Sequence, residues 1–446
     1  MKKLKQLNRH YLIYVVNLMI VIVVGVVLYA FSHADTVTKS VQPETGTPDS
    51  NSHVMSVNGA SGGMALHFGM QMNNAVGNIL INSTLTNRYT QYKNASESEV
   101  YANIASRGNL ESNPGGYNGY NGQGQFRVFC QYSHFNYDDP IVYPGQAGKA
   151  HLHMYWGNTG VDANTTKDSL VNTGGGTCEG YEANRTGYWM PAVLDGNNKA
   201  VIPESLLMYY KSASNLNAQT KVMPQGLKMI AGNSKGNPLS TPNNVNGIQW
   251  ECYTGSMNYT YEGQTIPNSC PANTRANVEA AGHNYDPNDN FPIKLVAIIY
   301  FPSCVAVDSN NNPILDTSQD LSRFPSNNHK DHLSYFVSQG GQLACPSSHP
   351  YIMPQVSYHV SWPGDLNYSG WKLSSDAMAG VPDGSSLHAD WMGGWNKTIM
   401  QHWTEGCINK GQNCAAGVMG NSANFSSQQL KTLPSSYNGP NPLTLP

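Results

Sequence analysis

One long apolar run near the N-terminus constrains this chain most, because it decides the compartment in which the remaining residues fold. The run extends from Tyr11 to Phe31 without a charged residue, and a cluster of lysines with Arg9 precedes it. At about 1.5 Å per residue, a helix of this length just crosses a bilayer core of roughly 30 Å. Basic residues before such a run keep the N-terminus in the cytoplasm. We therefore predict a cytoplasmic leader at 1–10 and a transmembrane helix at 11–31, rather than a buried core helix.

The run can also be interpreted as a signal sequence. Ser32-His33-Ala34 places small residues where a signal peptidase needs them, although the apolar run is longer than the usual 7–15 residues. A retained anchor is favoured, which makes the protein a single-pass cell-membrane protein with its domain outside. Cleavage after Ala34 would make the protein secreted.

All eight cysteines lie beyond the apolar run. An even number of cysteines on the oxidising side of a membrane predicts up to four disulfides. No CxxC pair is present, so neither a zinc ribbon nor a dithiol redox motif is supported. Short spacing makes Cys252–Cys270 and Cys407–Cys414 the local candidates, and the spacing leaves the remaining pairing open.

The composition excludes one class of partner. Charged residues make up 12% of the chain, about half of the usual share. Asn, Ser, Thr, Gln, Gly and Tyr fill the deficit, which is common in secreted β-rich proteins and in surfaces that bind sugars. The net charge is −3, and no basic cluster follows the leader, so we expect no nucleic-acid partner.

Composition divides the chain beyond the membrane segment into four parts. Residues 35–60 are polar and rich in small residues, which predicts a flexible stalk. Residues 61–124 include a capping box at Ser96 and end in a glycine-rich linker. Residues 125–415 form the main globular domain, and 416–446 form a C-terminal extension.

Strand signals dominate the main domain. Residues 126–130 and 295–301 are short apolar runs between turn residues, and 356–362 alternates apolar and polar side chains. One late helix is predicted from tryptophans and Ile399 at every fourth position between Trp391 and Trp403, with Gly406 at its end. The expected fold is mainly β: a β-sandwich or jelly-roll-like core with long loops and a few short helices.

His151 and His153 are the strongest chemical signal. Residues two apart on a strand face the same side, so the two imidazoles can form half of a divalent metal site or an acid/base pair. The alternative is a pair of structural histidines. Just upstream, Asp138 and Asp139 can add carboxylates or form an Asx turn.

Two further clusters carry His and Asp. An Asp such as Asp390 fixes the tautomer and raises the basicity of a histidine such as His388, although Asp390 can also be the N-cap of the tryptophan-striped helix. Asp331 and His332 form the third cluster. These segments contain no HExxH, GxSxG or phosphate-binding loop, so zincin, α/β-hydrolase and nucleotide-binding classes are poorly supported.

The order of these motifs resembles DUF1996, a family of fungal and bacterial proteins. The resemblance covers roughly residues 125 to 407 and rests on Phe126–Cys130, Asp139–Gly145, His151–His153 with Gly157-Asn158, Thr177-Cys178, Tyr188–Ala192, Phe301–Cys304, Asp331–Tyr335, Cys345-Pro346, His349-Pro350 and Leu387–Trp391 with Gly394-Trp395. It implies a secreted or surface protein and brings no established activity. Val305-Ala306-Val307 departs from the Trp-Asp-Gly-like stretch that the family pattern has after Cys304.

We hypothesise a carbohydrate-active enzyme, a hydrolase or lyase acting on extracellular glycan. Its catalytic candidates are His151, His153, Asp331, His332, His388 and Asp390, of which the first two are metal candidates. The substrate-contact candidates are Asp139, Tyr155, Asn158, Trp189 and Trp391. The alternatives are a non-catalytic module that binds glycan or a partner, and a metal-binding protein without turnover.

Overall fold

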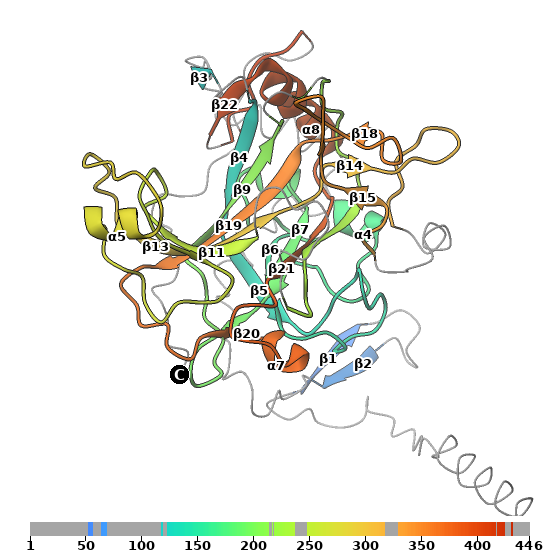
Figure 1. Cartoon of the computed structure of the whole chain (residues 1–446). Coiled ribbons are helices and arrows are strands. Elements are labelled where there is room, and N and C mark those ends of the chain that lie inside the picture. The colour runs from blue at the N-terminus through green and yellow to red at the C-terminus, as the bar shows by residue number, and fades with distance from the viewer. Residues whose placement is uncertain are drawn as a thin grey trace, which may run out of the picture. The chain divides into compact units, whose positions relative to one another are not determined.

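The computed structural model describes residues 123–213, 216, 218–236, 248–316, 329–415, 417–423 and 430, and the backbone of three short strands before them (Figure 1). Two of these strands, β1 (Ser52–Ser56) and β2 (Met64–Phe68), pair antiparallel. They belong to a first compact unit, 1–73, and all other described elements belong to a second unit, 74–446. β1 lies within the stretch predicted to be a stalk.

Both predicted helices of the N-terminal region, 11–31 and the helix after Ser96, lie outside the described residues. In the described part of the chain, no helix combines the length and the hydropathy needed to cross a bilayer.

Two large sheets dominate the second unit. The eight-stranded sheet has the order β12 (Tyr259–Gly263), β11 (Gln249–Tyr253), β13 (Lys294–Tyr300), β19 (Gln355–Pro363), β9 (Ser205–Lys211), β4 (Gln125–Cys130), β22 (Gln412–Cys414) and β3 (Tyr117–Asn118). The five-stranded sheet has the order β10 (Lys228–Gly232), β21 (His388–Met392), β7 (Gly187–Pro191), β6 (His153–Gly157) and β5 (Tyr132–Asn136). Neighbouring strands are antiparallel except β22 and β4. The strands predicted at 126–130, 295–301 and 356–362 are confirmed as β4, β13 and β19.

Smaller elements decorate these sheets. Short strands pair as β15 (Leu333–Ser334), β14 (Cys304–Val305) and β18 (Tyr351–Ile352), as β16 (Val337–Gln339) with β17 (Gln342–Ala344), and as β20 (Lys372–Leu373) with β8 (Val193–Leu194). The helices are α4 (Lys167–Asn172), α5 (Arg275–Ala280), α7 (Asp376–Ala379) and α8 (Lys397–Gly406), with 3-10 turns η5 (Tyr181–Ala183) and η7 (Ile408–Lys410). The described chain is therefore mainly β with a few short helices, as predicted.

The two large sheets share one hydrophobic core. Strand β9 shows the pattern directly, because alternate residues such as Met208 and Tyr210 are buried between the sheets while their neighbours face outward. Tyr210 Oη lies 2.8 Å from Tyr188 Oη of the other sheet. Tyr358 Oη donates across the core to the carbonyl of Asp390 at 2.5 Å. Buried hydroxyls thus find partners in the opposite layer and tie the two sheets together. Whether the topology is jelly-roll-like stays a prediction.

The prediction of one tryptophan-striped helix is wrong at its N-terminal half. Trp391 lies in strand β21, and α8 begins only at Lys397. The N-cap is Asn396, whose side-chain oxygen accepts from the Ile399 N–H at 3.0 Å. The four-residue spacing of the tryptophans and Ile399 is a coincidence, because these residues belong to a strand, a turn and a helix in succession. Asp390 is therefore not a helix cap.

All eight cysteines are paired. The predicted pairs Cys252–Cys270 and Cys407–Cys414 are both present. The other two disulfides join Cys130 to Cys178 and Cys304 to Cys345. Each disulfide stabilises the fold by about 2–4 kcal/mol, mainly by restricting the unfolded chain. Four disulfides indicate a domain that folds in an extracellular or secretory compartment.

Candidate metal centre

The outer face of the five-stranded sheet carries three of the predicted polar residues. His153 of β6 pairs with Pro191 of β7, and Asp390 of β21 pairs with Trp189, which also belongs to β7. Antiparallel register and the two-residue side-chain period therefore place His153, His388 and Asp390 on one face. The alternate residues of β21, Ala389 and Trp391, point into the core between the sheets.

Three imidazoles converge on this face. His151 lies just before β6, and its ring centroid is 4.2 Å from that of His153 and 5.1 Å from that of His388. The ligand nitrogens of the three side chains all lie within 4.8 Å of one another. A zinc ion bound at 2.0–2.1 Å needs nitrogens about 3.4 Å apart, so small side-chain movements bring these three atoms to ligand distance.

Backbone carbonyls fix the orientation of two of these rings. His153 Nδ1 donates to the carbonyl of Asp138 at 2.9 Å, and His388 Nδ1 donates to the carbonyl of Ser386 at 2.7 Å. A carbonyl oxygen can only accept, so each Nδ1 carries the proton and each Nε2 keeps its lone pair. The Nε2 atoms of His153 and His151 are buried and have no hydrogen-bond partner among the described residues. Metal-binding histidines have this arrangement, in which the second nitrogen is held by a carbonyl or carboxylate.

The electrostatic surroundings keep all three imidazoles neutral. Burial, with a smaller contribution from a neighbouring imidazole, lowers the pKa of His151 to about 2 and that of His153 to about 3, and the hydrogen bond to Asp138 opposes the shift of His153. Burial also holds the pKa of His388 well below its usual range, with a further contribution from His151. Neutral imidazole is the form that binds metals.

Two buried carboxylates adjoin the imidazoles. One ligand atom each from Asp139, Asp390 and His153 also lie within 4.8 Å of one another. Asp390 is 1% exposed, and neither of its carboxylate oxygens has a hydrogen-bond partner in the described part of the chain. Burial raises the pKa of Asp390 well above its usual value, the charge of Asp139 raises it further, and Lys330 opposes the shift. Burial likewise raises the pKa of Asp139 to about 6, against hydrogen bonds from the backbone and the attraction of Lys228.

The two groups of potential ligands share His153, which limits what the centre can hold. Nδ1 of His153 is engaged with Asp138, so only Nε2 remains for a metal. One nitrogen lone pair binds one ion. The arrangement therefore fits a single ion near His153, with imidazoles on one side and carboxylates on the other.

A loop built around Asp138 and Asp139 holds the centre together. The carbonyl of Asp138 accepts from both His153 and Tyr155 Oη, while its carboxylate accepts from the backbone N–H groups of Gly148 and Ala163. Asp139 Oδ1 accepts from the N–H groups of the second and third residues after it, which closes an Asx turn. Asp139 is thus both a turn residue and a member of the carboxylate pair.

Comparison with protein-family models now adds to this geometry. Residues 139–395, more than half of the chain, match the model described as "Domain of unknown function (DUF1996)". The chain belongs to this family. No curated protein and no solved structure matches the chain. The matched segment begins at Asp139 and contains all five residues of the candidate centre.

Three other predicted site residues of the DUF1996 domain do not belong to this centre. Asp331 is exposed, and His332 Nε2 bonds to the carbonyl of Lys228 at 2.8 Å. Neither belongs to the two groups of converging ligand atoms. Asn158 bonds to Gly160, Leu170 and Thr173, which closes the loop around α4.

Aromatic side chains pack on the same face of the sheet as the candidate centre of the DUF1996 domain. Tyr155 stacks on Trp189, with ring centroids 5.5 Å apart, and His134 stacks on the same Tyr155 at 4.6 Å. Both aromatic residues are fully buried in a small second core on this face. Trp391, on the other face of β21, belongs to the main core.

Sequence reasoning missed three contributors to the centre: Ser386, which acts through its backbone carbonyl, and Lys228 and Lys330, whose charges act on the two carboxylates. It named Asp138 for its carboxylate, whereas the backbone carbonyl of this residue holds His153. Any residue type can supply a backbone carbonyl, so such a contact cannot be predicted from the sequence. Only the Asp-Asp-Pro turn indicated that the loop around Asp138 lies near the histidines.

Proposed function

We propose that this domain binds one divalent transition-metal ion through His151, His153 and His388. The observation that carries the proposal is His153, whose Nδ1 is fixed by the carbonyl of Asp138 while its buried Nε2 has no hydrogen-bond partner among the described residues. The Nε2 of His151 is likewise buried without a partner there, and a backbone carbonyl also fixes Nδ1 of His388. Burying such nitrogens without a partner costs about 1–3 kcal/mol each, and a cation compensates for that cost.

The ligand chemistry favours zinc or a similar ion. Three neutral imidazoles suit Zn²⁺, Cu²⁺ or Ni²⁺, whereas carboxylates suit harder ions such as Mn²⁺. Asp390 belongs to the second set, beside His153, and its carboxylate is buried without a hydrogen-bond partner among the described residues. A cation beside this side chain neutralises a charge that the apolar surroundings disfavour.

We propose that this centre cleaves extracellular glycan, either by hydrolysis, as a hydrolase does, or by elimination, as a lyase does. The supporting observation is the carboxyl pair: burial raises the pKa of both Asp139 and Asp390, and two buried carboxyl groups beside one another can hold a proton and release it. A metal held by the three imidazoles would lower the pKa of a coordinated water and polarise substrate oxygens. Asp139 or Asp390 would hold the proton that the water or the substrate loses, and Lys228 and Lys330 would offset the negative charge of these two carboxylates.

Two further expectations complete the proposal. The domain works outside the cytoplasm, in agreement with its four disulfides, and residues 11–31 attach it to the cell membrane unless cleavage after Ala34 releases it. The competing function is a metal-binding or glycan-binding module without turnover. Release of reducing ends or unsaturated products from cell-wall polysaccharide distinguishes the two.

Elemental analysis tests the metal site directly. The protein is purified without a histidine tag, dialysed against chelator and then titrated with Zn²⁺, Cu²⁺, Ni²⁺ or Mn²⁺ while thermal unfolding is followed. At a free-metal concentration 100 times the dissociation constant, binding adds about 2.7 kcal/mol of stability, which raises the melting temperature by roughly 4–5 °C for a domain of this size.

His153→Gln and His388→Gln are expected to remove this increase, and His283→Gln is the matched control. His283 pairs with Glu262, and its side chain is 30% exposed. A folded protein that binds less than one ion per chain and shows no metal-dependent stabilisation contradicts the proposal. A preference for Mn²⁺ over Zn²⁺ would assign the ion to the carboxylates rather than to the imidazoles.

A further inference from the structure

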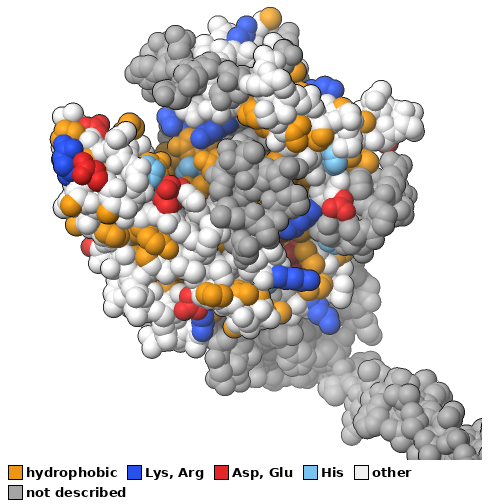
Figure 2. Space-filling view, in the orientation of Figure 1, with side chains coloured by type: hydrophobic (Ala, Val, Ile, Leu, Met, Phe, Trp, Pro, Cys, Tyr) orange, Lys and Arg blue, Asp and Glu red, His pale blue; other side chains and the backbone are white. Residues whose placement is uncertain are grey.

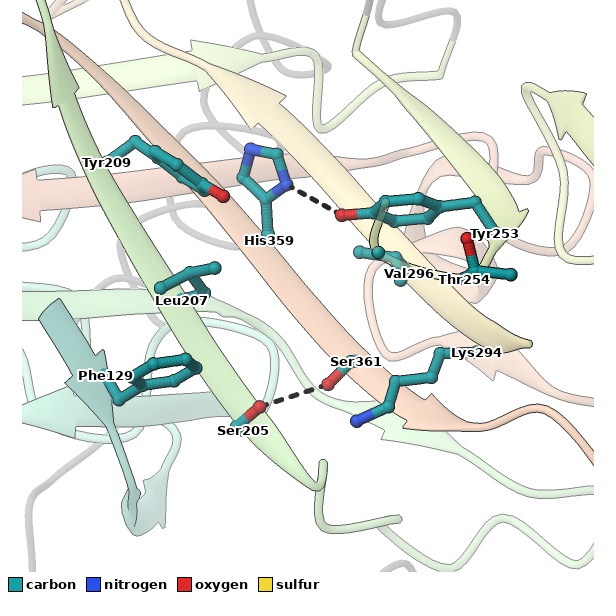
Figure 3. A pocket seen from close by; sticks show the side chains of 11 residues that line it. Phe129, Ser205, Leu207, Tyr209, Tyr253, Thr254, Lys294, Val296, His359 and Ser361 are labelled. Atoms are coloured by element: carbon teal, nitrogen blue, oxygen red, sulfur yellow. Dashed lines mark hydrogen bonds between the residues drawn. The ribbon is translucent and has the colours of Figure 1, made fainter. Parts of the chain in front are cut away.

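The outer face of the eight-stranded sheet carries a second feature that the metal centre does not involve. A hollow of about 150 Å³ opens there, lined by alternate residues of five strands that include Phe129, Leu207, Tyr209, Tyr253 and His359. We call it the sheet-face hollow. Its floor is the reverse side of the strands that form the main core (Figure 3). The metal centre lies on the other sheet, so the two features can be tested separately.

Neutral hydroxyl groups and one neutral imidazole line the polar part of the sheet-face hollow. Ser205 Oγ lies 3.1 Å from Ser361 Oγ, and Tyr253 Oη lies 3.3 Å from His359 Nδ1 (Figure 3). Burial holds the pKa of His359 well below its usual range, and Lys211 lowers it further. These groups can donate or accept hydrogen bonds without adding charge, which suits a polyhydroxylated ligand.

An exposed aromatic ring stands at the edge of the sheet-face hollow. Phe129 projects from β4 with 43% of its surface exposed. Leu207 and Val296 add apolar surface beside it. A ring next to hydroxyl-bearing side chains offers the two contacts that a sugar needs, one for its apolar ring face and one for its hydroxyl groups.

One cation lines the sheet-face hollow, and two more lie beside Tyr209, which also lines it. Its lining contains no carboxylate and one cation, Lys294, whose Nζ is paired with Glu204 at 2.8 Å. At the other end, Lys211 Nζ lies 4.1 Å from the centre of the Tyr209 ring and Arg127 lies 5.7 Å from it. Neither of these two cations forms an ion pair with a carboxylate of the described residues. Figure 2 shows histidine, hydrophobic and basic side chains over this part of the molecule, with an acidic side chain beside them.

The volume of the sheet-face hollow limits the size of the ligand that can bind there. Pockets for drug-sized ligands measure about 300–1,000 Å³, so the sheet-face hollow, at about 150 Å³, accommodates one small ring. The polar lining, the exposed aromatic ring and the two cations without carboxylate partners together point to one chemical class. We propose that the sheet-face hollow binds a single anionic sugar residue, a uronic acid or a sulfated sugar, within an extracellular polysaccharide.

Ligand-observed NMR titration tests this binding in the presence of chelator, so that the metal centre does not contribute. The probes are D-glucuronate, D-glucose 6-sulfate and D-glucose. An interaction with a charged group is expected to make at least one anionic sugar bind about ten times more tightly than glucose. Comparison of glucuronate with glucose 6-sulfate tells a carboxylate ligand from a sulfate ligand.

Lys211→Gln is expected to reduce the affinity for the anionic sugar about tenfold and to leave glucose binding unchanged. Phe129→Ser is expected to weaken both kinds of sugar together. Lys149→Gln, which removes an exposed cation elsewhere, is the matched control, and circular dichroism confirms that each variant folds.

Two results would overturn the assignment. One is equal affinity for anionic sugars and glucose in the wild-type protein, or no binding of either. The other is anionic-sugar binding that survives Lys211→Gln and Arg127→Gln but is lost in His153→Gln, which would move the ligand to the metal centre. Loss of metal binding in His153→Gln with unchanged sugar affinity supports the separation of the two sites.

Discussion

Glu179 offers a quantitative test of the electrostatics of the fold. It lies beside the Cys130–Cys178 disulfide and is 4% exposed. Its Oε2 accepts from the backbone N–H of Phe129 at 3.0 Å, and among the described residues no cation contributes to the shift of its pKa. Burial raises the pKa of this carboxyl group from 4.5 to about 7, although the single hydrogen bond opposes the change.

The sign of the effect follows from the direction of this shift. A folded-state pKa above the unfolded value means that the folded chain binds the proton more tightly. The contribution of Glu179 to the free energy of unfolding is therefore greatest below pH 4.5 and is lost as the pH rises through 7. At about 1.4 kcal/mol per pKa unit, the rise corresponds to a loss of about 3 kcal/mol between pH 4 and pH 8. Glu179→Gln removes the ionisation and keeps an oxygen that can accept from Phe129. The variant should therefore gain up to about 3 kcal/mol over the wild type at pH 8, relative to their difference at pH 4.

Urea denaturation at pH 4, 6 and 8, with disulfides intact, measures the free energy of unfolding of both proteins. Glu279→Gln is the matched control, because this carboxylate is 55% exposed and pairs only with Arg275, and such surface pairs contribute little. The difference between Glu179→Gln and wild type should grow steadily with pH. A difference that stays constant from pH 4 to pH 8 would refute the burial argument.

Two further predictions concern the metal centre and the disulfides. Asp390→Asn should stabilise the metal-free protein at pH 8, because it removes a buried charge without a hydrogen-bond partner in the described chain. The same substitution should weaken metal binding at least tenfold, which lowers the metal-dependent stability by about 1.4 kcal/mol. Denaturation with and without Zn²⁺ measures both effects, and a variant that is less stable than the wild type without metal contradicts the first expectation. Replacing Cys304 and Cys345 together by serine opens a loop with a sequence separation of 41, against 7 for Cys407 and Cys414. The chain-entropy relation gives losses of about 4 and about 2.5 kcal/mol, so equal midpoints in urea for the two double variants would contradict it.

The sequence allowed the strands of the eight-stranded sheet to be predicted where the side-chain alternation was clean. In β19, Val356, Tyr358 and Val360 are fully buried and His359 faces the sheet-face hollow, as the two-residue period requires. The tryptophan stripe misled because its spacing continues across the break between β21 and α8. A period of four residues signals a helix only if the backbone is helical throughout, and the Gly393-Gly394 pair between them was the sign that it is not.

The candidate centre was partly visible in the same way. His151 with His153, and His388 with Asp390, are pairs spaced two apart, and that spacing keeps both members of a pair on one face of an extended chain. Which strands are neighbours could not be deduced, because the pairing of β6 and β21 with β7 joins segments that are far apart in sequence. Asp331 and His332 have the same residue types but lie on a segment outside this sheet, so residue type alone could not separate them from the converging groups.

The position of the centre on β21 also couples metal binding to the stability of the whole domain. His388 and Asp390 face outward, while Ala389 and Trp391 between and beside them are fully buried in the main core. The carbonyl of Asp390 accepts from Tyr358 of the opposite sheet, so the strand that presents two site residues is also tied to the second layer. An ion that draws these side chains toward His153 therefore acts on a strand held on both faces, and local opening of the centre requires loss of core contacts as well. Metal-dependent protection from hydrogen exchange is thus expected in β19 as well as in β6 and β21.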